Sequence, residues 1–175
     1  AEETAEEQLD AYQSEYFGIK QYAPISNRYD GLLDIRHVGI NDEKGFYFYV
    51  MDLADDLATN KAVVSGDLES YQPKTLSDYL HKHGGRLDLA EVRDIAIQVC
   101  VALKYLNSEE LVHRDIKPEN IICVRGKWKL ADFGFVALTG ATTLVGSMGY
   151  IPPEGPGKAT ADIYSLGKMI YVMAT

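Results

Sequence analysis

The chain has 175 residues, 46% of them hydrophobic and 25% charged, enough to bury the core of one ordinary globular domain. Its 26 acidic and 17 basic residues give a net charge of −9, which argues against general nucleic-acid binding. No apolar run is long enough to predict a membrane segment, and no secretory signal opens the sequence. Cys100 and Cys123 stand in apolar runs without CxxC spacing, which predicts buried, reduced thiols in a cytoplasmic protein.

The first part of the chain predicts a helix, a hairpin and an insertion. Residues 5–23 favour a helix, and the six acidic residues within residues 1–15 predict a solvated helix face or a frayed end. Residues 32–38 and 46–51 predict two strands joined by a turn at 41–45. Residues 58–74 are polar and irregular, which indicates a surface insertion.

Two capped helices are predicted next. Thr75 with Asp78 forms a capping box for a short helix that ends at 84–85, and Asp88 with Glu91 opens a longer one. The longer helix carries one apolar stripe, made of Val92, Ile95, Ala96, Val99, Leu103 and Leu106.

The last part of the chain predicts a tight hairpin, a loop-rich stretch and a terminal helix. Residues 121–124 and 128–131 would pair around a turn at 125–127, and the helix would start near Thr160. This helix meets no stop signal before Thr175, and the chain does not open with methionine, so we expect a fragment.

The chemistry concentrates in residues 113–120, His-Arg-Asp-Ile-Lys-Pro-Glu-Asn, followed by Asp-Phe-Gly at 132–134. Asp115 alone would be interpreted as an aspartate in a surface turn. The whole string offers a proton acceptor, a fixed cation and two metal-binding side chains. It resembles the catalytic and metal loops of eukaryotic-like serine/threonine protein kinases.

The resemblance runs from about residue 12 to residue 175. It implies an α+β protein with a partial, two-lobed protein-kinase-like fold. Residues 1–54 would be the remnant of the small lobe, with helix C and the hinge, and residues 55–175 part of the helical large lobe. Residues 151–157 and 161–168 look like those of bacterial members.

The resemblance also implies a role for each side chain of the loop. Asp115 would orient and deprotonate the substrate hydroxyl, since an ordinary aspartate is ionised at neutral pH. Lys117 would neutralise charge on the transferring phosphate of ATP and indicate Ser/Thr acceptors. Arg114 would pair with a phosphorylated activation segment. Asn120 and Asp132 would hold Mg²⁺ through their oxygen atoms.

Residues 48–54 resemble the strand and hinge that receive adenine, although a strand of this kind is more often plain core. Met51 would lie at the back of the pocket, the backbones of Asp52 and Ala54 would bond the adenine edge, and Ile122 would form the floor.

Glu15 is the candidate for the glutamate of helix C, although it stands a few residues farther from the first strand than is usual. With Glu15 in that place, the side chains of Ile19, Ile35, His113 and Phe133 would stack as a regulatory column.

Residues 146–154 resemble the end of an activation segment, where Ser147 replaces the commoner threonine and keeps a hydroxyl for Asp115 and Lys117. Asp162 matches an aspartate that holds the catalytic loop by its backbone. Three threonines are candidate phosphorylation sites, with plain loop threonines an equal alternative: Thr139, Thr142 and Thr143.

Two kinase motifs do not occur in the sequence, namely G-x-G-x-x-G and a strand lysine of the V-A-I-K type. We therefore expect an ATP-dependent protein Ser/Thr kinase whose 175 residues alone are inactive, acting on a protein substrate and not on nucleic acid or membrane. A pseudokinase that serves as a binding scaffold is one alternative. A small-molecule kinase of the aminoglycoside type is another, but that type lacks a segment like 146–154.

Overall fold

The computed structural model describes residues 5–41, 45–63, 69–140 and 146–175, with side chains from residue 16 onward. Helices and short antiparallel hairpins alternate along the chain, so the predicted α+β class is confirmed. In chain order the elements are α1 (Ala5–Ser26), β1 (Ile35–Asn41), β2 (Phe46–Met51), α2 (Leu76–Lys82), α3 (Leu89–Ser108), β3 (Leu111–Val112), the 3₁₀ helix η1 (Pro118–Asn120), β4 (Ile121–Val124), β5 (Lys127–Leu130), β6 (Ala137–Leu138) and α4 (Ala159–Ala174).

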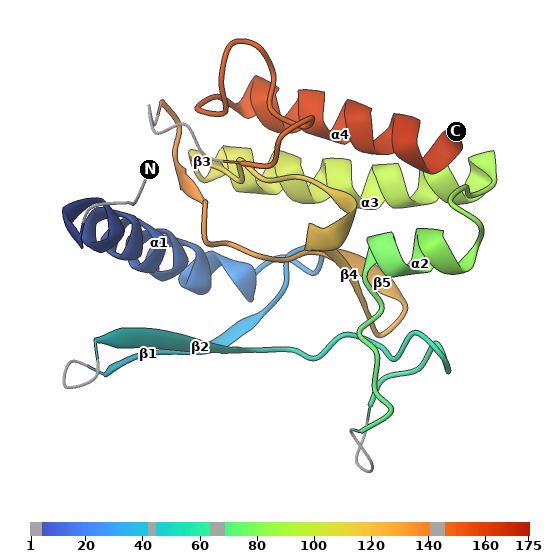
Figure 1. Cartoon of the computed structure of the whole chain (residues 1–175), viewed down its shortest axis with the longest axis horizontal. Coiled ribbons are helices and arrows are strands. Elements are labelled where there is room, and N and C mark those ends of the chain that lie inside the picture. Colours follow the sequence, from blue (N-terminus) through green and yellow to red (C-terminus); the bar gives the residue numbers. More distant parts are fainter. Residues whose placement is uncertain (1–4, 42–44, 64–68, 141–145) are drawn as a thin grey trace.

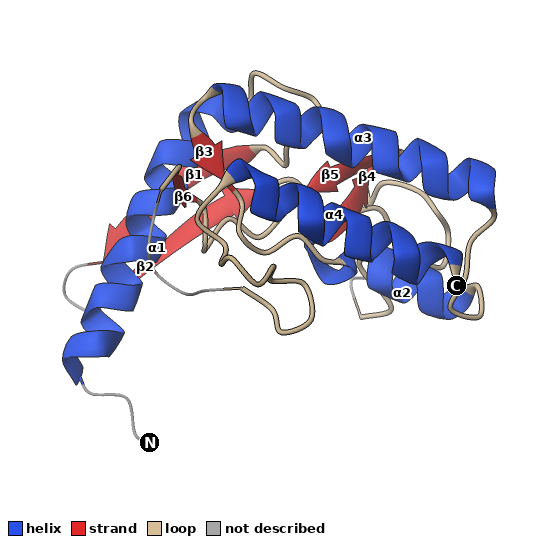
Figure 2. Ribbon diagram, turned by 90° about the horizontal axis from the view of Figure 1, so that it is seen from above, coloured by secondary structure: helices blue, strands red, loops and turns tan. Residues whose placement is uncertain are grey.

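The elements form two unequal parts. Figure 1 shows α3 and α4 side by side on one side of the molecule and the β1–β2 hairpin on the other. Helix α1 and the β4–β5 hairpin lie between them. The view from above in Figure 2 shows the same pairing of α3 with α4. The short β3–β6 pair joins the residues that follow α3 to residues 137–138, which precede the stretch leading to α4.

The N-terminal helix and first strand differ from their predicted bounds. Helix α1 continues to Ser26 and accommodates Pro24 in its last turn. Strand β1 starts at Ile35 instead of residue 32, because the preceding leucines bind the other hairpin. The N–H of Leu33 donates to the C=O of Leu130 at 2.9 Å, and Leu32 forms a parallel bridge with Leu130.

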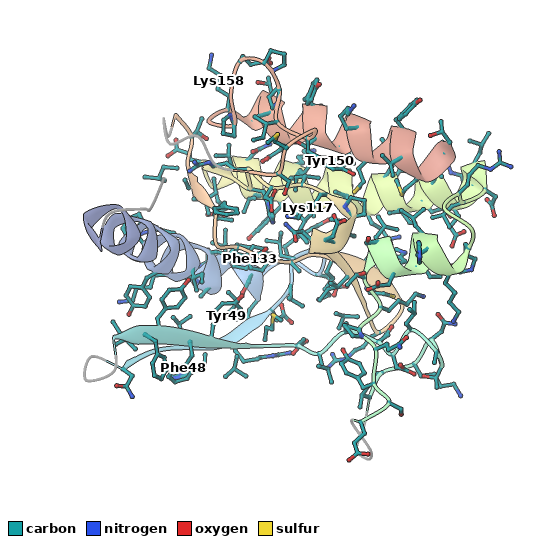
Figure 3. All side chains as sticks on the ribbon, viewed as in Figure 1. Phe48, Tyr49, Lys117, Phe133, Tyr150 and Lys158 are labelled. Carbon is teal, nitrogen blue, oxygen red and sulfur yellow. The ribbon has the colours of Figure 1, made fainter. Side chains whose placement is uncertain are left out.

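The β1–β2 hairpin has one inner and one outer face. Alternation along β2 places Tyr47 and Tyr49 against the core, while Phe48 is 44% exposed. Figure 3 shows Tyr49 on the side of α1 and Phe48 on the opposite side. The ring of Phe48 covers Gly39 on the paired strand, where a β-carbon would come within 2.4 Å of the ring.

The caps of α2 and α3 are those that the sequence predicts. The side chain of Thr75 accepts the N–H of Asp78 at 3.0 Å, and the side chain of Asp88 accepts the N–H of Glu91 at 2.9 Å.

The apolar stripe of α3 packs on α4, and each fully buried Leu, Ile or Val there stabilises the fold by about 1.5–3 kcal/mol relative to exposure.

The two cysteines do not share one environment. Cys123 is buried in β4, as predicted. Cys100 is exposed, so its predicted burial is wrong. Its neighbour Val99 takes the buried position of the α3 stripe and leaves Cys100 on the outer face. Among the described helices, none combines the length and apolarity that a bilayer crossing requires.

The β4–β5 hairpin turns in two residues. Arg125 and Gly126 both have positive φ, 53° and 77°, as the type I′ turn of a tight hairpin requires. Strand β5 therefore begins at Lys127, one residue earlier than predicted. The hairpin leads directly from η1 to residue 132.

Candidate active site

The loop after β3 is fixed to α4 by one buried carboxylate. Asp162 is fully buried and accepts the backbone N–H groups of His113 and Arg114, both at 2.8 Å. The resemblance implied this contact for Asp162. Burial raises the pKa of Asp162, against the opposing effect of the two N–H donors. Arg114 has φ 73°, a left-handed conformation that is uncommon for non-glycine residues and occurs at constrained sites.

The side chain of Asp115 contacts three other residues of the site. Its side chain is buried, and Oδ1 accepts the backbone N–H of Ser147 at 2.9 Å. Its Oδ2 lies 2.8 Å from both Lys117 Nζ and Asn120 Nδ2. Burial alone would raise the pKa of Asp115, but the hydrogen bonds from Lys117, Ser147 and Asn120 outweigh it and hold the pKa below its ordinary value. The carboxylate is therefore ionised at neutral pH.

Lys117 joins the loop to the segment that precedes α4. Its Nζ donates to Ser147 Oγ at 2.6 Å, across 30 positions of the chain. The approach is close because residue 146 is glycine: at φ 121°, a β-carbon on Gly146 would lie 2.6 Å from the C=O of Arg114. Figure 3 shows Lys117 and Tyr150 on the side of the loop that faces α4. The predicted contact of the Ser147 hydroxyl with Lys117 is present, whereas Asp115 accepts the backbone N–H of Ser147.

Asn120 and Asp132 are brought together by the hairpin between them. The N–H of Ala131 donates to the C=O of Asn120 at 2.9 Å, which places Asp132 next to η1. The Nδ2 of Asn120 bonds both Oδ2 and the C=O of Asp115, so its Oδ1 is left to accept. Asp132 is exposed and has φ 60°. An amide oxygen beside a solvent-facing carboxylate fits a hard cation such as Mg²⁺.

Phe133 is held by a ring that the sequence did not predict as its partner. Tyr22 of α1 stacks on Phe133 with ring centroids 3.5 Å apart, and His113 meets its edge at 5.7 Å. Ile19 was expected in this column. It is buried, and Tyr22, almost one turn later, stacks on Phe133. The hydroxyl of Tyr22 also donates to the C=O of Leu33 at 3.0 Å.

His113 is neutral in this setting. Burial lowers its pKa, although Asp162, Asp132 and Asp115 act in the opposite sense. Its Nε2 lies 3.1 Å from the C=O of Ala131 and therefore carries the proton and donates. This bond connects the start of the loop with the residue before Asp132.

Glu15 lies in α1, but its side chain is outside the described residues, so its ion-pair role stays a prediction. The side of α1 that meets the segment after Phe133 presents Gly18. A β-carbon on Gly18 would lie 2.4 Å from the C=O of Val136 and 3.6 Å from that of Phe133. The helix thus packs directly on the backbone of this segment.

The predicted adenine-binding residues come from the end of β2, the segment after it and β4. Ala54 is buried, and no described residue accepts a hydrogen bond from its N–H. Ile122 is 8% exposed in β4, and Met51 is 46% exposed at the end of β2. The carboxylate of Asp52 binds Arg36 at 2.8 Å and its N–H donates to the C=O of Asp34 at 3.3 Å, so its C=O is the backbone group left to serve a ligand. Hydrogen bonding to Arg36 lowers the pKa of Asp52.

Sequence reasoning missed Asp55, which joins the segment containing Ala54 to β4. Its N–H donates to the C=O of Cys123 at 2.7 Å, and its carboxylate accepts N–H groups of the β4–β5 turn. The available signal was a pair of aspartates, Asp55 and Asp56, directly after an apolar strand. Only the first of the two is buried.

Of the threonines proposed for phosphorylation, Thr139 is described. Its N–H and its Oγ1 both donate to the C=O of Glu110, at 2.9 and 3.0 Å. This hydroxyl therefore tethers the segment to the end of α3. Thr142 and Thr143, and with them the proposed partner of the Arg114 side chain, lie outside the described residues.

Comparison with known proteins adds independent support. A family model described as "Protein kinase domain" matches residues 50–175, more than half of the chain. Serine/threonine-protein kinase 36 of Pongo abelii is 35% identical over 135 residues, 71% of this chain and 10% of that protein. A probable serine/threonine-protein kinase of Clostridium acetobutylicum is 34% identical over 119 residues, 62% of this chain and 18% of its own length. The 3-phosphoinositide-dependent protein kinase 1 of Arabidopsis thaliana is 36% identical over 126 residues, 61% of this chain and 26% of its own length.

Proposed function

The chain belongs to the protein kinase domain family, and from this premise we propose that it supplies the proton-acceptor and metal side of an ATP-dependent Ser/Thr kinase. The observation that carries the proposal is the set of contacts on Asp115. Its two oxygens bind Ser147, Lys117 and Asn120, which come from two segments of the chain. A surface aspartate in a turn would not collect a cation, an amide and a backbone N–H.

Asp115 would orient the acceptor hydroxyl and accept its proton. Lys117, Ser147 and Asn120 stabilise the carboxylate and hold the pKa of Asp115 below its ordinary value, so the group is ionised and able to accept the hydroxyl hydrogen. Catalysis of phosphoryl transfer depends mainly on positioning the reactants and stabilising the developing charge. Lys117, 2.8 Å from Asp115, would place its positive charge beside the transferring phosphate.

Asn120 and Asp132 would hold Mg²⁺, which would neutralise charge on the phosphate groups of ATP. The adenine of ATP would meet the backbones of Asp52 and Ala54, with Ile122 beneath it and Met51 behind. The roles of Arg114 toward a phosphorylated segment and of Glu15 toward a strand lysine belong to the same proposal.

The acceptor would be a Ser or Thr hydroxyl of a protein. The support is the contact of Lys117 and Asp115 with Ser147, in the segment that resembles a peptide-positioning one. A small-molecule kinase of the aminoglycoside type would not need this segment. A pseudokinase scaffold is disfavoured because Asp115, Lys117 and Asn120 are all present and connected.

Residues 1–54 would be the remnant of the small lobe and residues 55–175 part of the large one. The chain spans 10% of the length of its serine/threonine-protein kinase 36 relatives. Because its sequence has neither the glycine-rich motif nor the strand lysine, we expect these 175 residues alone to transfer phosphate poorly. We also propose a bacterial-type kinase, on residues 151–157 and 161–168, and a reducing, cytoplasmic setting, on the free thiols of Cys100 and Cys123.

The metal assignment can be tested on the purified chain by electron paramagnetic resonance with Mn²⁺ and ATP. Wild type should bind Mn²⁺ more tightly when ATP is present, and Asp132→Asn should remove this gain. Asp132 is exposed, so the variant should fold normally. Asp30→Asn is the matched control, because Asp30 is an exposed carboxylate outside the proposed site. Equal Mn²⁺ affinity of wild type and Asp132→Asn in the presence of ATP would contradict the proposal.

A further inference from the structure

Among the described residues, hydrogen bonds tie the short segment after β2 to the β4–β5 hairpin at Asp55. We propose that Asp55 is a positioning residue that sets the spacing between Ala54 and Ile122, the two walls of the proposed adenine site. The inference rests on the proposed function for the identity of the ligand. It adds a residue that none of the motifs in the sequence includes.

The carboxylate of Asp55 fills an anion-binding nest. Successive backbone N–H groups in a turn can point to one side of the chain, and such a concavity binds anions. Arg125 and Gly126 form this arrangement in the β4–β5 turn, with φ 53° and 77°. Asp55 Oδ1 accepts the N–H of Arg125 and Oδ2 accepts that of Gly126, both at 2.8 Å. The anion that occupies the nest therefore comes from the chain itself.

The backbone of Asp55 is held as firmly as its side chain. Its N–H donates to the C=O of Cys123 at 2.7 Å, and its C=O accepts the N–H of Lys74 at 2.8 Å. The N–H of Cys123 in turn donates to the C=O of Lys74 at 2.9 Å. Asp55 and Cys123 directly follow Ala54 and Ile122, so these bonds fix the two predicted adenine contacts relative to each other.

A carboxylate suits this position better than any other side chain. It offers two acceptor oxygens to two N–H groups, and its charge strengthens both bonds. Asp55 is 2% exposed, and Cys123 Sγ lies 3.4 Å from Oδ2, so water does not reach the pair easily. Removing the carboxylate would leave two turn N–H groups without their acceptor and free the segment from the hairpin.

The neighbouring residue provides a matched control. Asp56 also accepts backbone N–H groups, from Thr59 at 3.0 Å and Gln72 at 3.3 Å. These partners lie within the insertion and do not connect it with β4 or β5. A general loss of acidic charge or of loop structure would therefore affect both aspartates, whereas the proposed role belongs to Asp55 alone.

The test compares Asp55→Ala, Asp55→Asn and Asp56→Ala by amide hydrogen exchange and by titration with adenosine, at a denaturant-free condition where each variant is folded. In Asp55→Ala we expect faster exchange confined to Arg125, Gly126 and residues 52–55, and adenosine affinity lower by about tenfold. Asp55→Asn keeps one acceptor oxygen, so its exchange rates and adenosine affinity should lie between those of wild type and Asp55→Ala. Asp56→Ala should behave as wild type.

Unchanged adenosine affinity in folded Asp55→Ala would overturn the proposal, and so would uniformly faster exchange throughout the chain. If Asp55→Ala does not fold, Asp55→Asn decides by the same two criteria. Failure of the wild-type chain to bind adenosine would contradict the proposed nucleotide site instead. In that case local exchange at residues 52–55 still decides whether Asp55 holds the segment on the hairpin.

Discussion

The carboxylate of Asp162 accepts the backbone N–H of His113 at 2.8 Å, although 49 positions of sequence separate the two residues. Its other oxygen accepts the N–H of Arg114. Helix α4 therefore holds in place the start of the loop that contains Asp115. Without this carboxylate, two buried N–H groups would have no acceptor, and the left-handed conformation of Arg114 would lose its support.

Asp162→Ala should lower the free energy of unfolding by about 2–4 kcal/mol, because each unsatisfied buried donor costs about 1–3 kcal/mol. Urea denaturation followed by circular dichroism measures this loss. Asp94→Ala is the control, since Asp94 forms an exposed pair with Arg93 and should change stability by less than about 1 kcal/mol. Similar losses for the two variants would contradict a tethering role for Asp162.

Asp115→Asn should remove a contribution to stability that wild type has at neutral pH and loses in acid. The folded pKa of Asp115 lies below its unfolded value, because Lys117, Ser147 and Asn120 outweigh the effect of burial. Its ionic contribution is therefore complete above the unfolded pKa of about 3.9 and is lost as the pH falls through the lower folded value.

Urea denaturation of wild type and Asp115→Asn across about pH 3 to 7 tests this sign. The difference between the two unfolding free energies should stay constant from about pH 7 to 5 and shrink only below about pH 4. A difference that already shrinks between pH 7 and 5 would indicate a raised pKa and a different environment for Asp115.

Gly18→Ala should destabilise the fold by about 1–3 kcal/mol, because the new methyl group would meet the C=O of Val136 at 2.4 Å and displace α1. Gly167→Ala is a matched change in α4, where a β-carbon meets nothing within 4 Å, and it should stabilise by about 0.5–1 kcal/mol. Thermal unfolding of both variants should show shifts of opposite sign. Shifts of the same sign would contradict the close approach of α1 to Val136.

Tyr22→Phe should cost about 1 kcal/mol, because it removes the hydrogen bond to Leu33 and retains the stacking on Phe133. Tyr22→Ala should cost about 3–5 kcal/mol, since it also opens a cavity beside Phe133. Tyr171 is 64% exposed, and Tyr171→Ala serves as the control with little effect. Equal losses in Tyr22→Phe and Tyr22→Ala would show that the stacking contributes nothing.

Local signals allowed much of the fold to be predicted. Caps depend on residues three positions apart, so Thr75 and Asp88 indicated their helix starts correctly. The bounds of β2 follow from a run of aromatic and aliphatic residues. The start of β1 was not predictable in this way, because Leu33 bonds to Leu130, which lies far along the chain.

The site also divides into residues that local sequence predicts and residues that depend on distant partners. Asp115, Lys117 and Asn120 belong to one short string, so the sequence predicted them as a group. Tyr22 was not predicted because nothing in the sequence of α1 indicates that its ring stacks on Phe133, which lies far along the chain. Asp55 escaped because its partners are backbone N–H groups, which side-chain motifs do not reveal.

The role of Asp115 is decided by phosphate transfer to a serine peptide, measured with a fusion that supplies a glycine-rich loop and a strand lysine before residue 1. Asp115→Asn should reduce the rate of transfer by at least about 100-fold, while the affinity for Mg-ATP changes by less than about twofold. Transfer at the wild-type rate would contradict the assignment of Asp115 as the residue that positions and deprotonates the hydroxyl. Loss of Mg-ATP binding would contradict it as well, because it would place Asp115 on the nucleotide side of the site.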